Sequence, residues 1–170
     1  MYLYQRPNWP EFSWNPAAIA AVLEAACRRK GQRIDWALHL AAPTQIDVFL
    51  SALTEEIVRS NEIEGLHFDR QEVRSLLTWR LGIGSDGVPP ADRAIEGAVA
   101  VMLDATQNFR AALSLERLFG WHASLFPTTR SGKRRIIVGA WREGSMQIVS
   151  GKYSGRRVHY EAPPRREVRR

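Results

Sequence analysis

Cysteine is nearly absent from this 170-residue sequence, and long apolar runs and low-complexity segments are missing altogether. The single cysteine, Cys27, excludes an internal disulfide and any zinc site built from several cysteines. No run of about 18 apolar residues occurs, so the sequence predicts no membrane-spanning helix. The opening MYLYQRPNWPEF has no cationic lead into an apolar core, unlike a secretory signal peptide. We therefore expect a cytoplasmic protein with no membrane partner.

The composition is that of an ordinary globular protein, with 45% hydrophobic and 25% charged residues. The length suits one domain or two small ones, since domains typically hold about 100–200 residues. The net charge of +6 is uneven: residues 1–129 carry 12 basic and 15 acidic side chains, and residues 130–170 carry 12 basic and 3 acidic. Such a basic end attracts phosphate, in nucleic acid or in a nucleotide, or is simply solvated. The sequence leaves these alternatives open.

Helical periodicity dominates the first half of the chain. Asn15 and Pro16 are typical of a helix start, and Gly31 is expected to end this helix. Its apolar face is expected to be Ile19, Val22, Leu23 and Ala26. Thr44 is expected to cap a second helix, which Gly65 ends in a left-handed conformation. The apolar stripe of the second helix is Ile46, Phe49, Leu50, Leu53 and Ile57.

Three more helices are expected, from Asp69, over residues 91–109 and from Ser114. The loop 81–90 is rich in glycine and proline and is the best internal boundary. His122 lies on the apolar stripe of the last of these helices, and we expect it to be a packed, structural histidine. The fold class predicted from these patterns is mainly α.

The pattern changes after Gly132. Ile136–Val138 and Gln147–Val149 are short β-prone runs, and Arg142–Ser145 between them is typical of a turn, which predicts a hairpin. Val158–Tyr160 is a candidate third extended segment.

The most unusual local feature is the end of the second predicted helix. Ser60 and Glu64 lie four residues apart, on the face that packs into the core further upstream. A carboxylate there is costly unless a cation or a hydrogen-bond donor meets it, so we expect a positive group opposite Glu64. The alternatives are an ordinary intramolecular ion pair and a solvent-exposed last turn.

The segment Ser60–Gly65 resembles the inhibitory helix motif of Fic-domain proteins, (S/T)xxxE(G/N), with Ser60, Glu64 and Gly65 at the motif positions. Further segments resemble the subfamily in which an extra N-terminal domain precedes the Fic domain: residues 4–10 with Phe12 and Trp14, 88–93, 102–108, 118–122, 135–136, 138–142 and 158–164.

The resemblance implies a helical fold with one small β-hairpin and the transfer of AMP from ATP to a hydroxyl of a protein target. It implies that Glu64 pairs with an arginine of the catalytic motif and blocks the productive position of the γ-phosphate. The hairpin, or flap, holds the target by strand addition. The matching flap positions are Ile136, Ile137, Val138, Gly139, Met146, Gln147, Ile148 and Val149.

The sequence departs from the family at the catalytic motif, HxFx(D/E)GN(G/K)RxxR, because it contains no Gly-Asn dipeptide at all. ATP and Mg²⁺ are expected to bind that missing segment, so we expect neither to bind tightly to this chain and no catalytic residue within it. The expected organisation is an N-terminal helical domain over 1–85, the first part of a Fic domain over 86–164 and a basic tail over 165–170. The chain is thus expected to be a truncated adenylyltransferase without activity of its own.

Two alternatives belong to other classes of function. A non-catalytic regulator would offer Glu64 to an intact Fic core in trans, so the expected partner is a protein substrate or such a core. Nucleic-acid binding through the basic C-terminal segment ranks last, because no recognition helix or aromatic-basic platform accompanies the charge. Homodimerisation is left open.

Overall fold

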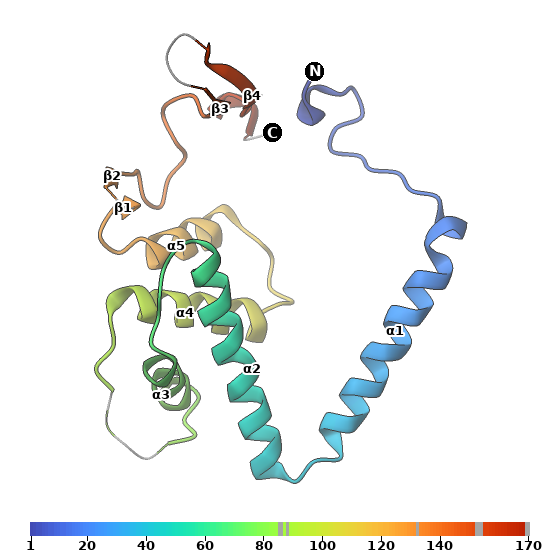
Figure 1. The fold of residues 1–170 in the computed structure, drawn as a ribbon, viewed down its shortest axis with the longest axis vertical. Coiled ribbons are helices and arrows are strands. Elements are labelled where there is room, and N and C mark those ends of the chain that lie inside the picture. The colour runs from blue at the N-terminus through green and yellow to red at the C-terminus, as the bar shows by residue number, and fades with distance from the viewer. Residues whose placement is uncertain (85–86, 88, 132, 152–154, 169–170) are drawn as a thin grey trace. The chain divides into compact units, whose positions relative to one another are not determined.

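The computed structural model describes residues 1–84, 87, 89–131, 133–151 and 155–168, and these are mainly helical, which confirms the predicted fold class (Figure 1). In chain order the elements are the 3₁₀-helix η1 (Leu3–Gln5), α1 (Pro16–Leu38), α2 (Ala42–Ile63), α3 (Arg70–Arg80), α4 (Arg93–Gln107), α5 (Leu115–Leu125), β1 (Arg130–Ser131), β2 (Arg134–Arg135), β3 (Gln147–Ser150), β4 (Arg157–Glu161) and α6 (Arg165–Val168). No helix within the described ranges combines the length and the apolar character needed to traverse a bilayer.

The chain divides into two compact units. One unit joins residues 1–32 to residues 141–170 and so brings the two ends of the chain into one body. The other comprises residues 33–140, and helix α1 runs from the first unit into the second.

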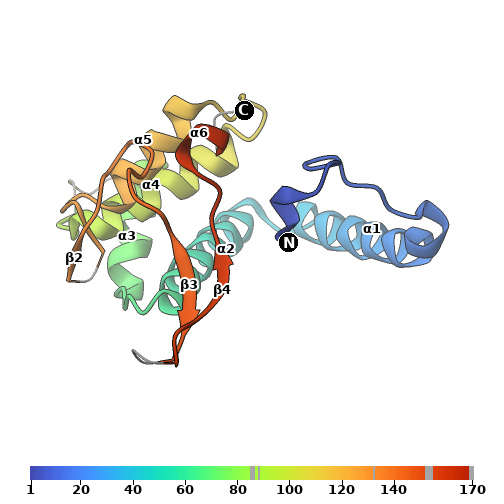
Figure 2. The ribbon, with the colours of Figure 1, turned by 90° about the horizontal axis from the view of Figure 1, so that it is seen from above.

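The core of the 33–140 unit lies among α2, α3 and α4, and α5 packs along α4 (Figure 2). Its apolar side chains come from all three helices because each helix repeats apolar residues at three- and four-residue spacing. The buried residues are Leu50, Leu53, Ile57, Val58, Val73, Leu76, Leu77, Ile95, Ala98 and Val99. Ile46 and Phe49, predicted on the same stripe of α2, remain over 40% exposed.

Several predicted helix starts are confirmed by their caps. The side chain of Asp69 accepts a hydrogen bond from the backbone N–H of Glu72 at 2.9 Å, and Ser114 accepts one from Arg117 at 3.2 Å. The carboxylate of Glu72, three residues after Asp69, bonds to the start of another helix. It accepts from the backbone N–H of Asp92 at 2.7 Å and so ties α3 to the start of α4.

Two predicted helix ends are wrong. Gly31 does not stop α1, which continues to Leu38, because a glycine ends a helix only where a left-handed residue is needed and Gly31 is helical. Helix α2 begins at Ala42, ahead of the predicted cap Thr44. Pro43 fits this first turn because its missing N–H would have no partner there.

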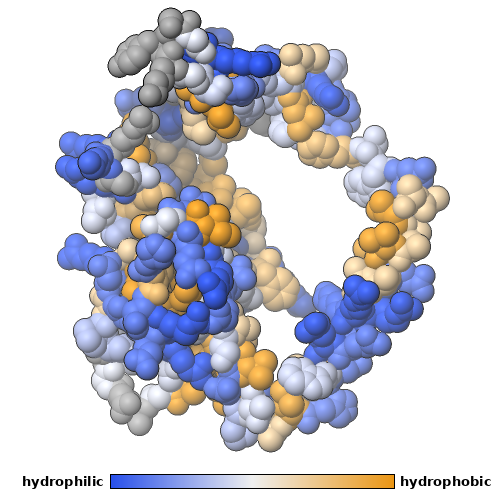
Figure 3. Space-filling view, viewed as in Figure 1, coloured by the Kyte–Doolittle hydropathy of each residue, from blue (hydrophilic) through white to orange (hydrophobic). Residues whose placement is uncertain are grey.

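The apolar face predicted for α1 is not buried. Val22 is 73% exposed and Leu23 57%, and apolar side chains lie uncovered along α1 in Figure 3. Helix α1 therefore has the same amphipathic spacing as the core helices, but no element of the part of the chain that the structure describes buries its apolar face.

The predicted pairing of Ile136–Val138 with Gln147–Val149 is also wrong. Strand β3 pairs antiparallel with β4, with Ile148 opposite Tyr160 and a bulge between Ile148 and Val149. Residues 136–138 are irregular, and their backbone is bonded nearer in sequence: the N–H of Ile136 donates to the carbonyl of Thr129 at 3.0 Å. The third extended segment, Val158–Tyr160, is confirmed as part of β4.

Candidate functional site

The end of α2 is built as a Schellman motif around Gly65. The N–H of Leu66 donates to the carbonyl of Asn61 at 2.9 Å, and the N–H of Gly65 donates to that of Glu62 at 3.0 Å. Gly65 has φ +79°, a left-handed conformation that side chains with a Cβ disfavour. The predicted left-handed C-cap is confirmed, and this turn ends helix α2 at its C-cap, Glu64.

The last turns of α2 are anchored to the core on their other side. Ile57 and Val58 are 1% and 3% exposed, and the buried Thr54 hydroxyl donates to the carbonyl of Leu50 at 2.7 Å. The amide of Asn61 donates to the carbonyl of Ile57 at 2.8 Å, which closes the half-buried face of the final turn. The segment that carries Ser60 and Glu64 is therefore held by packing and hydrogen bonds.

Glu64 itself is exposed, and no positive side chain of the described residues pairs with it. Of the two alternatives to a positive group opposite Glu64, an intramolecular ion pair and a solvent-exposed last turn, the described residues show the second: Glu64 is the exposed C-cap of α2. Ser60 is also exposed, and its hydroxyl donates to Glu56 Oε1 at 3.2 Å. Ser60, Glu64 and Gly65 are thus close along one exposed helix end without contacting one another through side chains.

The other acidic groups on α2 differ from Glu64 in having partners. Arg59 donates to Glu62 Oε2 at 2.7 Å and lies 3.6 Å from Glu55, which also pairs with Arg70. These exposed pairs satisfy the local carboxylates at little energetic gain. Glu64 is left as the carboxylate available to an arginine from outside the described residues.

The predicted flap residues fall in different settings. Gln147, Ile148 and Val149 lie in β3, directly after Met146, whose carbonyl accepts from the N–H of Ala162 at 2.8 Å. Their side chains are exposed, Ile148 at 55%. The two-stranded sheet pairs β3 with β4 alone among the described residues, so β3 keeps one edge open for strand addition.

The other predicted flap positions, Ile136, Ile137, Val138 and Gly139, belong to the 33–140 unit. Gly139 has φ +67°, and its N–H donates to His122 Nδ1 at 3.2 Å. The His122 ring also meets the ring of Phe126 edge-on, with centroids 5.0 Å apart. His122 therefore accepts a backbone bond and packs, as a structural histidine does.

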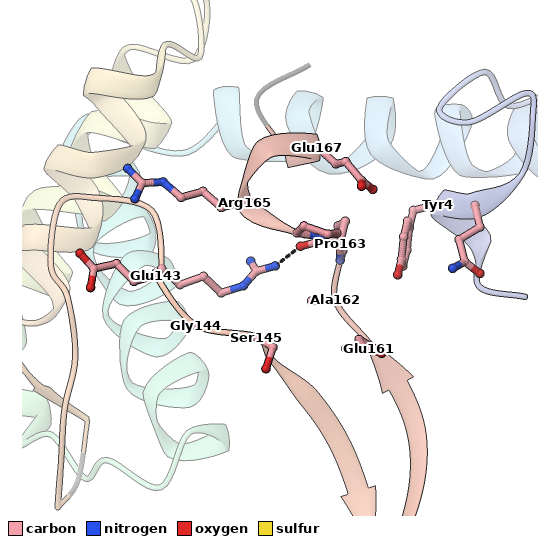
Figure 4. A pocket seen from close by; sticks show the side chains of 12 residues that line it. Tyr4, Glu143, Gly144, Ser145, Glu161, Ala162, Pro163, Arg165 and Glu167 are labelled. Atoms are coloured by element: carbon pink, nitrogen blue, oxygen red, sulfur yellow. Dashed lines mark hydrogen bonds between the residues drawn. The ribbon is translucent and has the colours of Figure 1, made fainter.

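A cavity of about 460 Å³ lies in the unit that joins the two chain ends (Figure 4). Residues 4–5 line it on one side, and residues 142–145, 161–165 and 167 complete it. Arg142 lines it and donates to the carbonyl of Pro163, while its Nε is buried and meets no acceptor among the described residues. Glu161 and Glu167 add carboxylates to the wall that Tyr4 shares.

The groups around this cavity shift the pKa of Tyr4. Partial burial of the phenol raises the pKa of Tyr4, and the neighbouring Tyr160 and the Glu161 carboxylate raise it further. Sequence reasoning missed this cavity: Tyr4 and Glu161 stood out only as parts of segments resembling a family, and nothing in their spacing predicts that the chain ends meet.

The described residues gather no three His, Cys, Asp or Glu side chains that could together hold a metal ion. The phosphate-binding and magnesium-binding groups implied by the resemblance belong to the motif that this sequence does not contain. That neither ATP nor Mg²⁺ binds tightly to this chain stays a prediction.

Residues 2–83 match a family described as a domain of unknown function (DUF4172). The matched range contains helices α1, α2 and α3, and with them Ser60, Glu64 and Gly65. No curated protein matches the chain. The family description names no activity, so a function has to be argued from the residues.

Proposed function

We propose that this chain is the inhibitory and target-docking part of a Fic-type protein adenylyltransferase, an enzyme that transfers AMP from ATP to a protein hydroxyl. The observation that carries the proposal is the state of Glu64. Its carboxylate is exposed and unpaired among the described residues, on a helix end that the core and the Gly65 turn hold in place. An inhibitory carboxylate needs such a placement, because it must meet an arginine of another segment.

The hairpin supports the second half of the proposal. Strand β3 carries Gln147, Ile148 and Val149 with one open edge, and extended peptides bind such edges through backbone hydrogen bonds. The apolar side chains of Ile148 and Val149 stay exposed, which leaves them free to contact a target segment.

A second candidate function is regulation in trans, in which the chain docks on a separate Fic core that carries the catalytic motif. The exposure of Glu64 favours it, because the carboxylate is presented outward by a chain whose sequence lacks that motif. Both candidates assign Glu64 the same role and differ in whether the catalytic arginine is in the same polypeptide.

The test mixes the purified chain with a Fic core that contains HxFx(D/E)GN(G/K)RxxR and lacks its own inhibitory helix. Light scattering after gel filtration is expected to show a one-to-one complex, and labelled ATP with Mg²⁺ is expected to show no AMP transfer by the chain alone. Robust transfer by the chain alone would contradict both candidates. Absence of a complex would contradict regulation in trans.

A further inference from the structure

Three tyrosine rings join the first residues of the chain to strand β4. Tyr2 is the N-cap of η1 and Tyr4 lies within it, and their rings are stacked, with centroids 5.8 Å apart and planes 17° from parallel. Both meet Tyr160 edge-on, at 5.3 Å and 6.2 Å between centroids. Edge-to-face packing is a favoured arrangement of aromatic rings, so a small aromatic cluster attaches η1 to β4 near the C-terminal end of that strand.

The hairpin that receives this contact has little else to hold it. Strands β3 and β4 form a sheet of two strands, and most of their side chains are exposed. An isolated two-stranded hairpin is marginally stable in water. The ring contacts at Tyr160 therefore add to the pairing with β3 and to the Ser150–His159 hydrogen bond in ordering β4.

The cluster tolerates a neutral Tyr4 and opposes a charged one. Glu161 follows Tyr160 in the chain, and Glu167 lies on the same cavity wall, so two carboxylates act on the Tyr4 phenol. Two cations line the cavity as well: Arg142, which donates to the carbonyl of Pro163 and keeps a buried Nε without an acceptor among the described residues, and Arg165, which is exposed to solvent.

We propose that Tyr2 and Tyr4 form a clamp on strand β4, and that negative charge placed on the Tyr4 phenol opens it. Tyr4 is partly exposed, so its hydroxyl oxygen can accept the γ-phosphoryl group of ATP from a protein tyrosine kinase, with release of ADP. The charge would repel Glu161 and Glu167 and force solvation of the phenol, which separates its ring from Tyr160. The β3–β4 hairpin then loses its attachment to η1. This device is independent of the role proposed for Glu64.

The test is amide hydrogen exchange, measured by mass spectrometry on the full chain, because exchange reports local opening. Four proteins are compared: wild type, Tyr4→Phe, a protein with phosphotyrosine incorporated at position 4, and that protein with Glu161→Gln and Glu167→Gln. Phosphotyrosine is expected to speed exchange in residues 157–161 roughly tenfold, while Tyr4→Phe, which keeps the ring, leaves it close to wild type. Exchange in α4 is expected to stay the same in all four.

The two glutamine substitutions are expected to restore part of the lost protection, because they remove the repulsion. Unchanged or slower exchange with phosphotyrosine would overturn the proposal, as would an equal loss of protection in Tyr4→Phe. Failure of the glutamine substitutions to restore any protection would overturn the electrostatic cause.

Discussion

The indole N–H of Trp121 on α5 donates to Asp104 Oδ2 on α4 at 2.7 Å. Arg117 Nε donates to the same oxygen at 2.7 Å, and the amide of Asn108 donates to Oδ1 at 2.7 Å. The guanidinium of Arg117 also lies over the Trp121 ring, 4.8 Å from its centroid. One carboxylate therefore collects donors from both helices and fixes α5 on α4.

Asp104 makes the stability of this helix pair depend on pH. The hydrogen bonds from Asn108, Arg117 and Trp121 lower the pKa of Asp104 to about 2, from an ordinary value of 3.8. Because the folded pKa is depressed, the stabilisation is complete above about pH 4 and is lost as the pH falls toward 2. We expect Asp104→Asn to lower the melting temperature at pH 6 and to differ less from wild type at pH 2.5.

The measurement is thermal unfolding by circular dichroism at both pH values, with Glu116→Gln as a control that lies exposed in the first turn of α5. A difference between Asp104→Asn and wild type that stays constant from pH 6 to 2.5 would show that the Asp104 network has no such role.

Two glycines test how closely α4 and α5 approach. A Cβ at Gly97 would collide with the backbone carbonyl of Ser124, whereas a Cβ at Gly120 would meet nothing within 4 Å. Gly97→Ala is expected to lower the free energy of unfolding by about 1–3 kcal/mol through overpacking. Gly120→Ala is expected to raise it by about 0.5–1 kcal/mol, because alanine favours helix. Urea unfolding measures the free energy of unfolding of both variants. Equal changes in the two would argue against a close crossing of α4 and α5 at Gly97.

The turn at Gly65 is expected to be intolerant of a side chain. Gly65→Ala places a Cβ at φ +79° and is expected to cost about 1–2 kcal/mol in the free energy of unfolding. Glu64→Gln, one residue earlier, is expected to change it by less than about 0.5 kcal/mol because the Glu64 side chain is exposed. Urea unfolding measures both free energies. A Gly65→Ala variant as stable as wild type would mean that the left-handed turn does not hold the end of α2.

The helix caps and the turn at Gly65 were predictable from the sequence. Asp69 and Ser114 cap their helices, and Gly65 takes the left-handed turn, because each outcome depends on a few neighbouring backbone groups. The apolar stripe predicted on α2 contributes Leu50 and Ile57 to the core, because the apolar faces of three helices pack against one another.

Other features depended on partners that spacing does not reveal. The face of α1 has a core-like pattern, yet Val22 is exposed, because periodicity does not specify a covering element. Strand β3 pairs with β4, while Ile136 bonds nearer in the chain, to Thr129. The contact of Tyr4 with Tyr160 joins distant parts of the sequence and has no local signal.

The most direct test of the role proposed for Glu64 is the initial rate of AMP transfer by a Fic core without its own inhibitory helix, titrated with this chain. Wild type is expected to lower the rate in a saturable way, and Glu64→Gly and Glu64→Gln are expected to abolish that inhibition. Glu62→Gln, which removes a carboxylate paired with Arg59, is expected to inhibit like wild type. Inhibition that survives Glu64→Gly, or a wild-type chain that leaves the rate unchanged while bound to the core, would contradict the proposed role.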